Sequence, residues 1–122
     1  MILIADDNSQ VRRMMRDLIE DIDPEIVECK DGGAAIAAYD LHHPDFVLMD
    51  IHMTPVDGLT ATKEILSRYP EAKIIAVTQY QDTGTRDAAM SLGMWAFVAK
   101  DDLMSLRVLL LQTGSDRSVG GS

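Results

Sequence analysis

An apolar run that ends in an aspartate, followed by a loop and a glycine, most constrains how this chain can fold. Segment 45–58 has the sequence DFVLMDIHMTPVDG. The four apolar residues Phe46–Met49 are typical of a strand covered on both faces, as in the middle of a parallel sheet. A charged Asp50 in a core needs a partner, whereas at the carboxyl end of a central strand it lies where open α/β sheets bind ligands. For Asp50 taken alone, a helix cap or a turn carboxylate is the alternative interpretation.

Short apolar runs alternate with helical patterns along the whole chain. The expected strands are Ile2–Ala5, Ile26–Cys29, Phe46–Met49, Ile74–Val77 and Ala96–Ala99. The expected helices lie between Asn8-Ser9 and Asp23-Pro24, from Ala34 to about Leu41, from Gly58 to about Tyr69, and over Asp82–Leu92 and Leu103–Leu111. Such alternation predicts a parallel sheet with helices on both faces and right-handed crossovers. The fold class is therefore α/β, a three-layer α/β/α domain with a doubly wound five-stranded parallel sheet.

The length and the composition fit one domain. The 122 residues, of which 47% are hydrophobic, suffice for one sizeable core, and the sequence has no internal repeat. From about Gly114 the residues are small and polar. We therefore expect a folded domain over residues 1–113 and a flexible tail or linker stub over 114–122.

Charge and cysteine content exclude several functions. The net charge of −9 argues against direct binding of nucleic acid, which depends on Lys and Arg. No apolar run approaches the roughly 20 residues that span a bilayer, and the start MILIADDN lacks the basic segment of a signal peptide. The single Cys29 permits no internal disulfide. These features predict a cytoplasmic location without membrane contact.

Four of the predicted strands end in polar residues, and parallel strands bring those ends to one edge. The residues concerned are Asp6, Asp7, Asp50, Thr78 and Lys100. Neighbouring carboxylates repel one another and raise one another's pKa, which a hard divalent cation such as Mg²⁺ and the Lys100 ammonium would relieve. With the Thr78 hydroxyl as donor, such a pocket suits a tetrahedral oxyanion. It predicts phosphoryl transfer onto Asp50 as the nucleophile.

These motifs resemble the receiver domain of bacterial two-component response regulators, the CheY-like superfamily, from Met1 to about Thr113. The matching segments are IADDN, VLMDIHM, AVTQY and FVAKDD, and the step of 22 residues from Thr78 to Lys100 also matches. The resemblance implies a flavodoxin-like fold with strand order 2-1-3-4-5. It also implies that the chain is a phosphoprotein of a phosphorelay and not a turnover enzyme.

The resemblance implies a role for each residue of the pocket. Asp50 would accept the phosphoryl group from a sensor histidine kinase, a phosphotransfer protein or a small phosphodonor. Mg²⁺ would be held by Asp7, Asp50 and the backbone carbonyl of His52, with Asp6 acting through a water.

The resemblance also implies a switch. Thr78 and Lys100 would bind the phosphoryl group, and Phe97 would follow Thr78 inward. This movement would remodel the face formed by the fourth helix, the fifth strand and the fifth helix, as a two-state surface biased by one new charge cluster.

The partners implied are a kinase and an output. The pattern KDDL at residues 100–103 is similar to receivers that precede a LuxR-type helix-turn-helix domain, which would lie outside this chain. The same face of fourth helix, fifth strand and fifth helix is where the resemblance would place a homodimer contact.

Some positions depart from the family pattern. Thr54 stands where the family usually has proline, and Pro55 follows. Gln79 follows Thr78 where the family favours a small residue. Our hypothesis is that His52, Gln79 and Tyr80 tune access of water to the acyl phosphate.

Three alternative functions stay open on the sequence. A pseudo-receiver would keep the fold as a protein-interaction module without phosphorylation. A haloacid dehalogenase-like phosphatase would also form an aspartyl phosphate, but His52 stands where its second aspartate belongs. A flavodoxin-type nucleotide binder would need a glycine-rich loop where this chain has DDNSQ.

Overall fold

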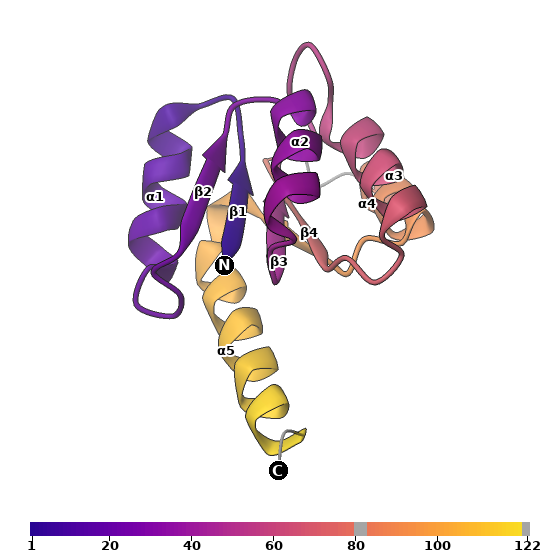
Figure 1. Ribbon diagram of the computed structural model, residues 1–122. Coiled ribbons are helices and arrows are strands. Elements are labelled where there is room, and N and C mark those ends of the chain that lie inside the picture. Colours follow the sequence, from indigo (N-terminus) through magenta and orange to yellow (C-terminus); the bar gives the residue numbers. More distant parts are fainter. Residues whose placement is uncertain (80–82, 121–122) are drawn as a thin grey trace.

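The fold is a five-stranded parallel sheet between two layers of helices (Figure 1). This computed structural model describes residues 1–79 and 83–120, with side chains for 1–79 and 83–112. The strands are β1 (Ile2–Ala5), β2 (Ile26–Cys29), β3 (Phe46–Met49), β4 (Ile74–Thr78) and β5 (Ala96–Ala99). The helices are α1 (Ser9–Ile19), α2 (Gly32–His42), α3 (Gly58–Arg68), α4 (Thr83–Leu92), the 3₁₀ turn η1 (Lys100–Asp102) and α5 (Leu103–Gly120). The strand order β2-β1-β3-β4-β5 confirms the predicted α/β fold and its flavodoxin-like order.

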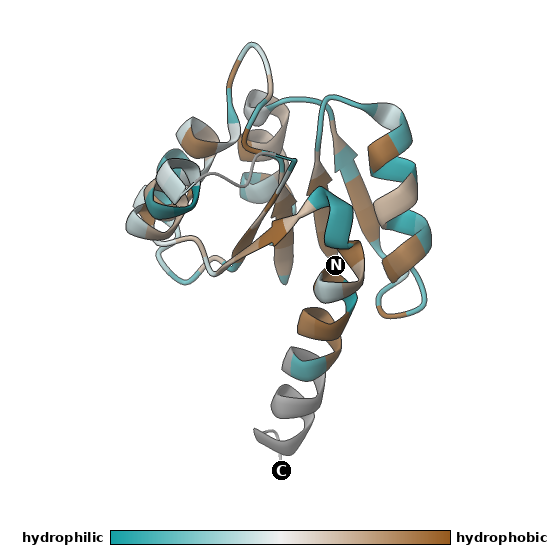
Figure 2. Cartoon of the chain, turned by 180° about the vertical axis from the view of Figure 1, so that it is seen from behind, coloured by the Kyte–Doolittle hydropathy of each residue, from teal (hydrophilic) through white to brown (hydrophobic). Residues whose placement is uncertain are grey.

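The central strands are buried on both faces, which explains their continuous apolar sequences. Every residue of β1, β3 and β4 is buried. One core cluster unites the sheet with α2, α3 and α4, and a second unites its other face with α1 and α5. Figure 2 shows the apolar strands between the two helical layers. Burial of these strands fixes the sheet and thereby the edge at which the polar residues meet.

Side-chain caps start the helices that follow β1, β2 and β3. Asn8 accepts hydrogen bonds from the backbone N–H groups of Gln10 and Val11 at the start of α1. Asp31 and Asp57 cap α2 and α3 in the same manner. Such caps satisfy N–H groups that have no partner inside the helix. They fix the three loops at the carboxyl edge of the sheet.

The carboxyl-terminal part of the domain differs from the prediction. The helix expected to end at Leu111 continues to Gly120, and η1 precedes it. Residues 112–118 contain no proline and one glycine, Gly114. A glycine costs about 1 kcal/mol in a helix without forbidding it. The domain boundary at residue 113 stays a prediction.

Two smaller boundaries also differ from the prediction. Thr78 belongs to β4, and α2 begins at Gly32, two residues before the predicted start. Asp82, placed in the fourth helix by the sequence pattern, lies outside the described residues. Within the part of the chain that is described, no helix is both long enough and apolar enough to cross a membrane.

Candidate functional site

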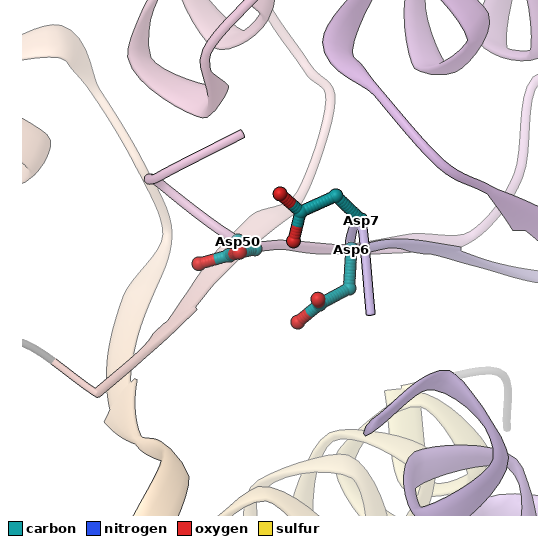
Figure 3. Close-up of side chains that lie close together, drawn as sticks. All are labelled: Asp6, Asp7 and Asp50. Carbon is teal, nitrogen blue, oxygen red and sulfur yellow. The ribbon is translucent and has the colours of Figure 1, made fainter. Parts of the chain in front are cut away.

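Two aspartates lie side by side where β1 and β3 end. The strand pairing continues one residue past the last paired residues of β1: the Asp6 N–H donates to the Cys29 carbonyl at 3.0 Å, and the Asp50 N–H donates to the Ala5 carbonyl at 2.9 Å. Asp7 follows directly, and carboxylate oxygens of Asp6, Asp7 and Asp50 lie within 4.8 Å of one another (Figure 3). The structure thus brings together the three carboxylates that the sequence placed at this edge.

Lys100 reaches this acidic cluster from the end of β5. Its Nζ lies 2.7 Å from Asp6 Oδ2 and 3.4 Å from Asp50 Oδ2. The Asp6 side chain is fully buried, and that of Asp50 is only 5% exposed. Buried charges need such a partner. The single Lys100 ammonium therefore forms ion pairs with two buried carboxylates.

The environment shifts the proton affinities of Asp50 and Lys100. Burial, and then the charge of Asp6, raise the pKa of Asp50, while Lys100 partly opposes them. Burial alone would lower the pKa of Lys100, but its ion pairs with Asp6 and Asp50 outweigh burial and raise it. Lys100 is accordingly a fixed positive charge beside a carboxylate whose ionised form is disfavoured.

The oxygen ligands in this cluster fit a hard divalent cation. Apart from the Lys100 ion pair, the buried Oδ2 of Asp6 has no hydrogen-bond partner among the described residues. Three carboxylates exceed the charge of one ammonium, and carboxylate oxygens are the ligands that Mg²⁺ and Ca²⁺ take in proteins. The cluster is therefore a candidate metal site, with Asp7 as its exposed member.

A polar pocket of about 260 Å³ opens onto the cluster. It is lined by Asp7, Asn8, Val11, Asp50, His52, Gln79 and Lys100. The exposed side chains of His52 and Gln79 stand at this pocket, as the access hypothesis requires. Tyr80, the third residue of that hypothesis, lies outside the described residues.

The two predicted switch residues lie beside the pocket on β4 and β5. Thr78 is fully buried at the end of β4 and is not among the pocket's lining residues. Phe97 pairs with Ala76 across the sheet and packs, partly buried, against the core of the α2–α4 layer. Neither residue is among those that line the pocket.

The loop after β3 folds back tightly onto Asp50. The His52 N–H donates to Asp50 Oδ1 at 3.3 Å, and the Gly58 N–H donates to the Ile51 carbonyl at 2.9 Å. The Thr54-Pro55 peptide in this loop is cis. The departure from the family pattern at Thr54-Pro55 leaves the pocket's carboxylates together.

Sequence reasoning missed several contributors to the site. Asn8 and Val11 line the pocket, but the sequence pattern assigns no site role to either. The sequence pattern also assigns no site role to Arg12, yet its guanidinium donates to the Asp6 carbonyl at 2.7 Å. The helical spacing indicates which side of a helix a residue occupies, but it gives no information on how far a long side chain reaches.

The fold and the site together define a class of protein: a flavodoxin-like α/β domain with an acidic, lysine-bearing pocket at the carboxyl edge of its sheet. The family model described as response regulator receiver domain matches residues 2–110, and the chain belongs to this family. It is thus a receiver of two-component signal transduction, which decides against the phosphatase and flavodoxin alternatives.

Known proteins with similar sequences are response regulators. The chain is 35% identical over 100 residues to the chemotaxis protein CheY of Listeria monocytogenes, covering 81% of this chain and 84% of that protein. It is 36% identical over 100 residues to CheY of Bacillus subtilis, with coverages of 81% and 83%. The transcriptional regulatory protein DegU of Brevibacillus brevis is 27% identical over 103 residues, 82% of this chain, which span 43% of DegU.

Solved structures of response regulators share this fold. A LuxR-family DNA-binding response regulator from Staphylococcus aureus superposes with a TM-score of 0.82 at 26% identity, covering 92% of this chain and 95% of the other. The receiver domain of NtrX from Brucella abortus gives a TM-score of 0.80 at 25% identity, with coverages of 93% and 99%.

Proposed function

We propose that this receiver takes a phosphoryl group on Asp50 and thereby switches an output. The observation that carries the proposal is the convergence of Asp6, Asp7, Asp50 and Lys100 at one pocket. A carboxylate oxygen of Asp50 attacks the phosphorus, and the bond from phosphorus to the phosphohistidine nitrogen, or to the acyl oxygen of a small phosphodonor, breaks. Lys100 neutralises charge on the phosphoryl oxygens.

The cation in this proposal is Mg²⁺. Asp7, Asp50 and the backbone carbonyl of His52 would hold it, with Asp6 acting through a water. When bound, it supplies positive charge to the oxygens of the transferred group. The buried Oδ2 of Asp6 and the three clustered carboxylates support this assignment.

The switch in this proposal runs from Thr78 to Phe97. Thr78 moves to hydrogen-bond the new phosphoryl oxygen, and Phe97 follows it inward. The buried position of Thr78 at the end of β4, and the position of Phe97 on the neighbouring β5, support this route. Its output is a changed surface over α4, β5 and α5.

The partners follow from that surface. We infer a cytoplasmic sensor histidine kinase or phosphotransfer protein as the donor, and an effector domain outside this chain as the output. The sequence KDDL at 100–103 and the LuxR-family structural relative support a helix-turn-helix effector, while the receiver itself does not bind nucleic acid or membrane.

A homodimer would form through α4, β5 and α5. The domain assists its own phosphorylation and dephosphorylation without turning over a soluble substrate.

The rim of the pocket would set the lifetime of the phosphate. The side chains of His52 and Gln79 line the pocket, where they shield the acyl phosphate from water. We expect Gln79→Ala to shorten the lifetime several-fold, which is less than the roughly 10²–10⁴-fold that a positioned general acid or base contributes, because a shielding side chain transfers no proton. Loss of phosphate followed by mass spectrometry tests this, and an unchanged lifetime contradicts it.

The function is tested by intact-mass spectrometry after incubation with acetyl phosphate and Mg²⁺. Wild type should gain about 80 Da, one phosphoryl group on its nucleophile, and Asp50→Asn should gain nothing. A wild type that stays folded and binds Mg²⁺ without gaining mass would overturn the proposal. It would favour the second candidate, a phosphorylation-independent pseudo-receiver, to which the departures at Thr54-Pro55 and Gln79 point.

A further inference from the structure

An arginine from α1 holds the turn that carries the acidic pair. The Arg12 Nη1 donates to the Asp6 carbonyl oxygen at 2.7 Å, and the Arg12 side chain is only 17% exposed. That oxygen belongs to the peptide group that joins Asp6 to Asp7. Because a peptide group is planar, a bond that fixes its oxygen also fixes the direction in which the chain enters Asp7.

Arg12 is itself held by a carboxylate on the edge strand β2. Its Nε lies 3.0 Å from Glu28 Oε1, and the Nε of Arg16 lies 2.8 Å from Glu28 Oε2. Glu28 pairs with Ile4, two residues before Asp6. A guanidinium has several donors in a rigid plane, so Arg12 serves Glu28 and the Asp6 carbonyl together. The result is a bridge from β2 through α1 to the acidic turn.

Asp6 and Asp7 depend on this bridge to different degrees. Asp6 is fixed by other bonds, since its Oδ1 accepts from the Asn8 N–H at 2.9 Å and its Oδ2 pairs with Lys100. The Asp7 carboxylate is exposed, and no hydrogen bond or ion pair to another described residue holds it. Its place in the cluster is therefore set by its own backbone, which the Arg12 bond orients.

We propose that Arg12 is a positioning residue for the cation, acting through Asp7, with Glu28 as its support. This inference rests on the proposed binding of Mg²⁺ and adds residues that do not touch the ion. Loss of a group that orients a metal ligand typically lowers metal affinity 10–100-fold. Arg12→Gln should therefore weaken Mg²⁺ binding about tenfold.

The direction in which the Mg²⁺ affinity changes distinguishes a positioning role of Arg12 from a purely electrostatic one. Arg12 is a cation near three carboxylates, so electrostatics alone predicts that its removal strengthens the binding of another cation. A positioning role predicts instead that removal of Arg12 weakens Mg²⁺ binding. Arg13 is the matched control, because it is exposed on the same helix and makes no hydrogen bond or ion pair with any described residue. Arg13→Gln removes the same charge and should change the affinity by less than about twofold.

The experiment is a calorimetric Mg²⁺ titration of the unphosphorylated wild type, Arg12→Gln, Arg13→Gln and Glu28→Gln. We expect about a tenfold weaker affinity for Arg12→Gln and a smaller loss for Glu28→Gln. The same order should appear in the Mg²⁺ concentration that gives half the maximal phosphorylation rate, with the rate at saturating Mg²⁺ little changed. A folded Arg12→Gln that binds Mg²⁺ as tightly as wild type, or more tightly, would overturn the positioning role.

Two further measurements distinguish a failure of the positioning role from a folding defect and from a failure of the proposed function. If Arg12→Gln does not fold by circular dichroism, Glu28→Gln decides the question in about 0.5 M salt, where long-range charge effects are screened; an unchanged affinity there would overturn the inference. A wild type that takes up neither Mg²⁺ nor a phosphoryl group would refute the proposed function itself, and the positioning role with it. A wild type that does both, beside an unaffected Arg12→Gln, refutes the positioning role alone.

Discussion

Asp50 occupies a position that disfavours its own charge. The residue is 4% exposed, and burial together with the nearby Asp6 raises its pKa above the ordinary value of an aspartate. A carboxylate whose pKa is higher in the folded than in the unfolded state destabilises the fold at every pH above the folded pKa. This cost disappears as the pH falls through the folded pKa toward the unfolded value. The proposed nucleophile thus lowers the stability of the domain, as is common for residues at functional sites.

Asp50→Asn should therefore stabilise the domain. Removing the disfavoured charge should raise the free energy of unfolding by about 1 kcal/mol at pH 7, and the gain should shrink toward pH 4. Urea unfolding at the two pH values measures it. The exposed Asp17 of α1 supplies the control, because Asp17→Asn should stay within about 0.5 kcal/mol of wild type. An Asp50→Asn variant less stable than wild type at pH 7 would show that the Lys100 ion pair outweighs burial.

Cys29 should be inert in the folded protein. Burial, and then the charge of Asp31, raise the pKa of its thiol to about 11, and the residue is 6% exposed. The thiolate is the reactive form, and at pH 8 it makes up about one part in a thousand of a thiol with this pKa. A disulfide reagent at pH 8 should label Cys29 only after denaturant is added. Rapid, complete labelling of the native protein would contradict this prediction.

At the scale of elements, the loop from β3 to α3 approaches the Asp50 backbone so closely that only a glycine fits at position 58. A Cβ at Gly58 would overlap the backbone carbonyl oxygen of Asp50 and crowd Ile51. The same loop is joined to α2, because the Gly32 N–H donates to the Val56 carbonyl at 3.0 Å. The first turn of α3 therefore lies directly against the backbone of Asp50, the proposed phosphoryl acceptor, and a side chain at Gly58 has no room.

Gly58→Ala should damage both stability and phosphorylation. The added methyl group must displace the backbone at Asp50, for which we expect a loss of about 2–3 kcal/mol in the free energy of unfolding and slower uptake of phosphate. Gly33→Ala is the matched control. A Cβ added at Gly33 would have Asp31 Oδ1, at 3.4 Å, as its nearest neighbour outside the local backbone. Alanine also favours a helix over glycine by up to about 1 kcal/mol. Urea unfolding and acetyl phosphate labelling test both variants; equal effects would contradict the crowding argument.

Local patterns in the sequence predicted the strands, most helices and the polar residues at the sheet edge. Phe46–Met49 could be assigned because a strand buried on both faces needs continuous apolar residues. The length of α5 could not, since Gly114 and its polar neighbours weaken a helix without ending it. The link from Arg12 to Glu28 could not be predicted either, because it joins residues of α1 and β2 that lie 16 positions apart in the sequence. The Arg12 link depends on tertiary contacts, which no local pattern encodes.

For the molecule as a whole, the proposed cation site would couple folding to cation binding. The chain carries a net charge of −9, and Asp6, Asp7 and Asp50 are gathered only in the folded state. A ligand that binds the folded state alone stabilises it by RT ln(1 + [L]/Kd). Folding and Mg²⁺ binding should therefore support each other.

Mg²⁺ should raise the free energy of unfolding by about 1.4 kcal/mol at roughly ten times its dissociation constant. Thermal unfolding with MgCl₂, with a chelator, and with NaCl at matched ionic strength measures this gain, and the chelator should reverse it. General screening of the net charge would act equally with NaCl, so equal shifts with both salts would contradict a specific site. Asp7→Asn should lose most of the gain specific to Mg²⁺, because Asp7 is the exposed member of the cluster and the proposed ligand that Lys100 compensates least. Its shift with NaCl should match that of wild type, since one exposed charge barely alters the total.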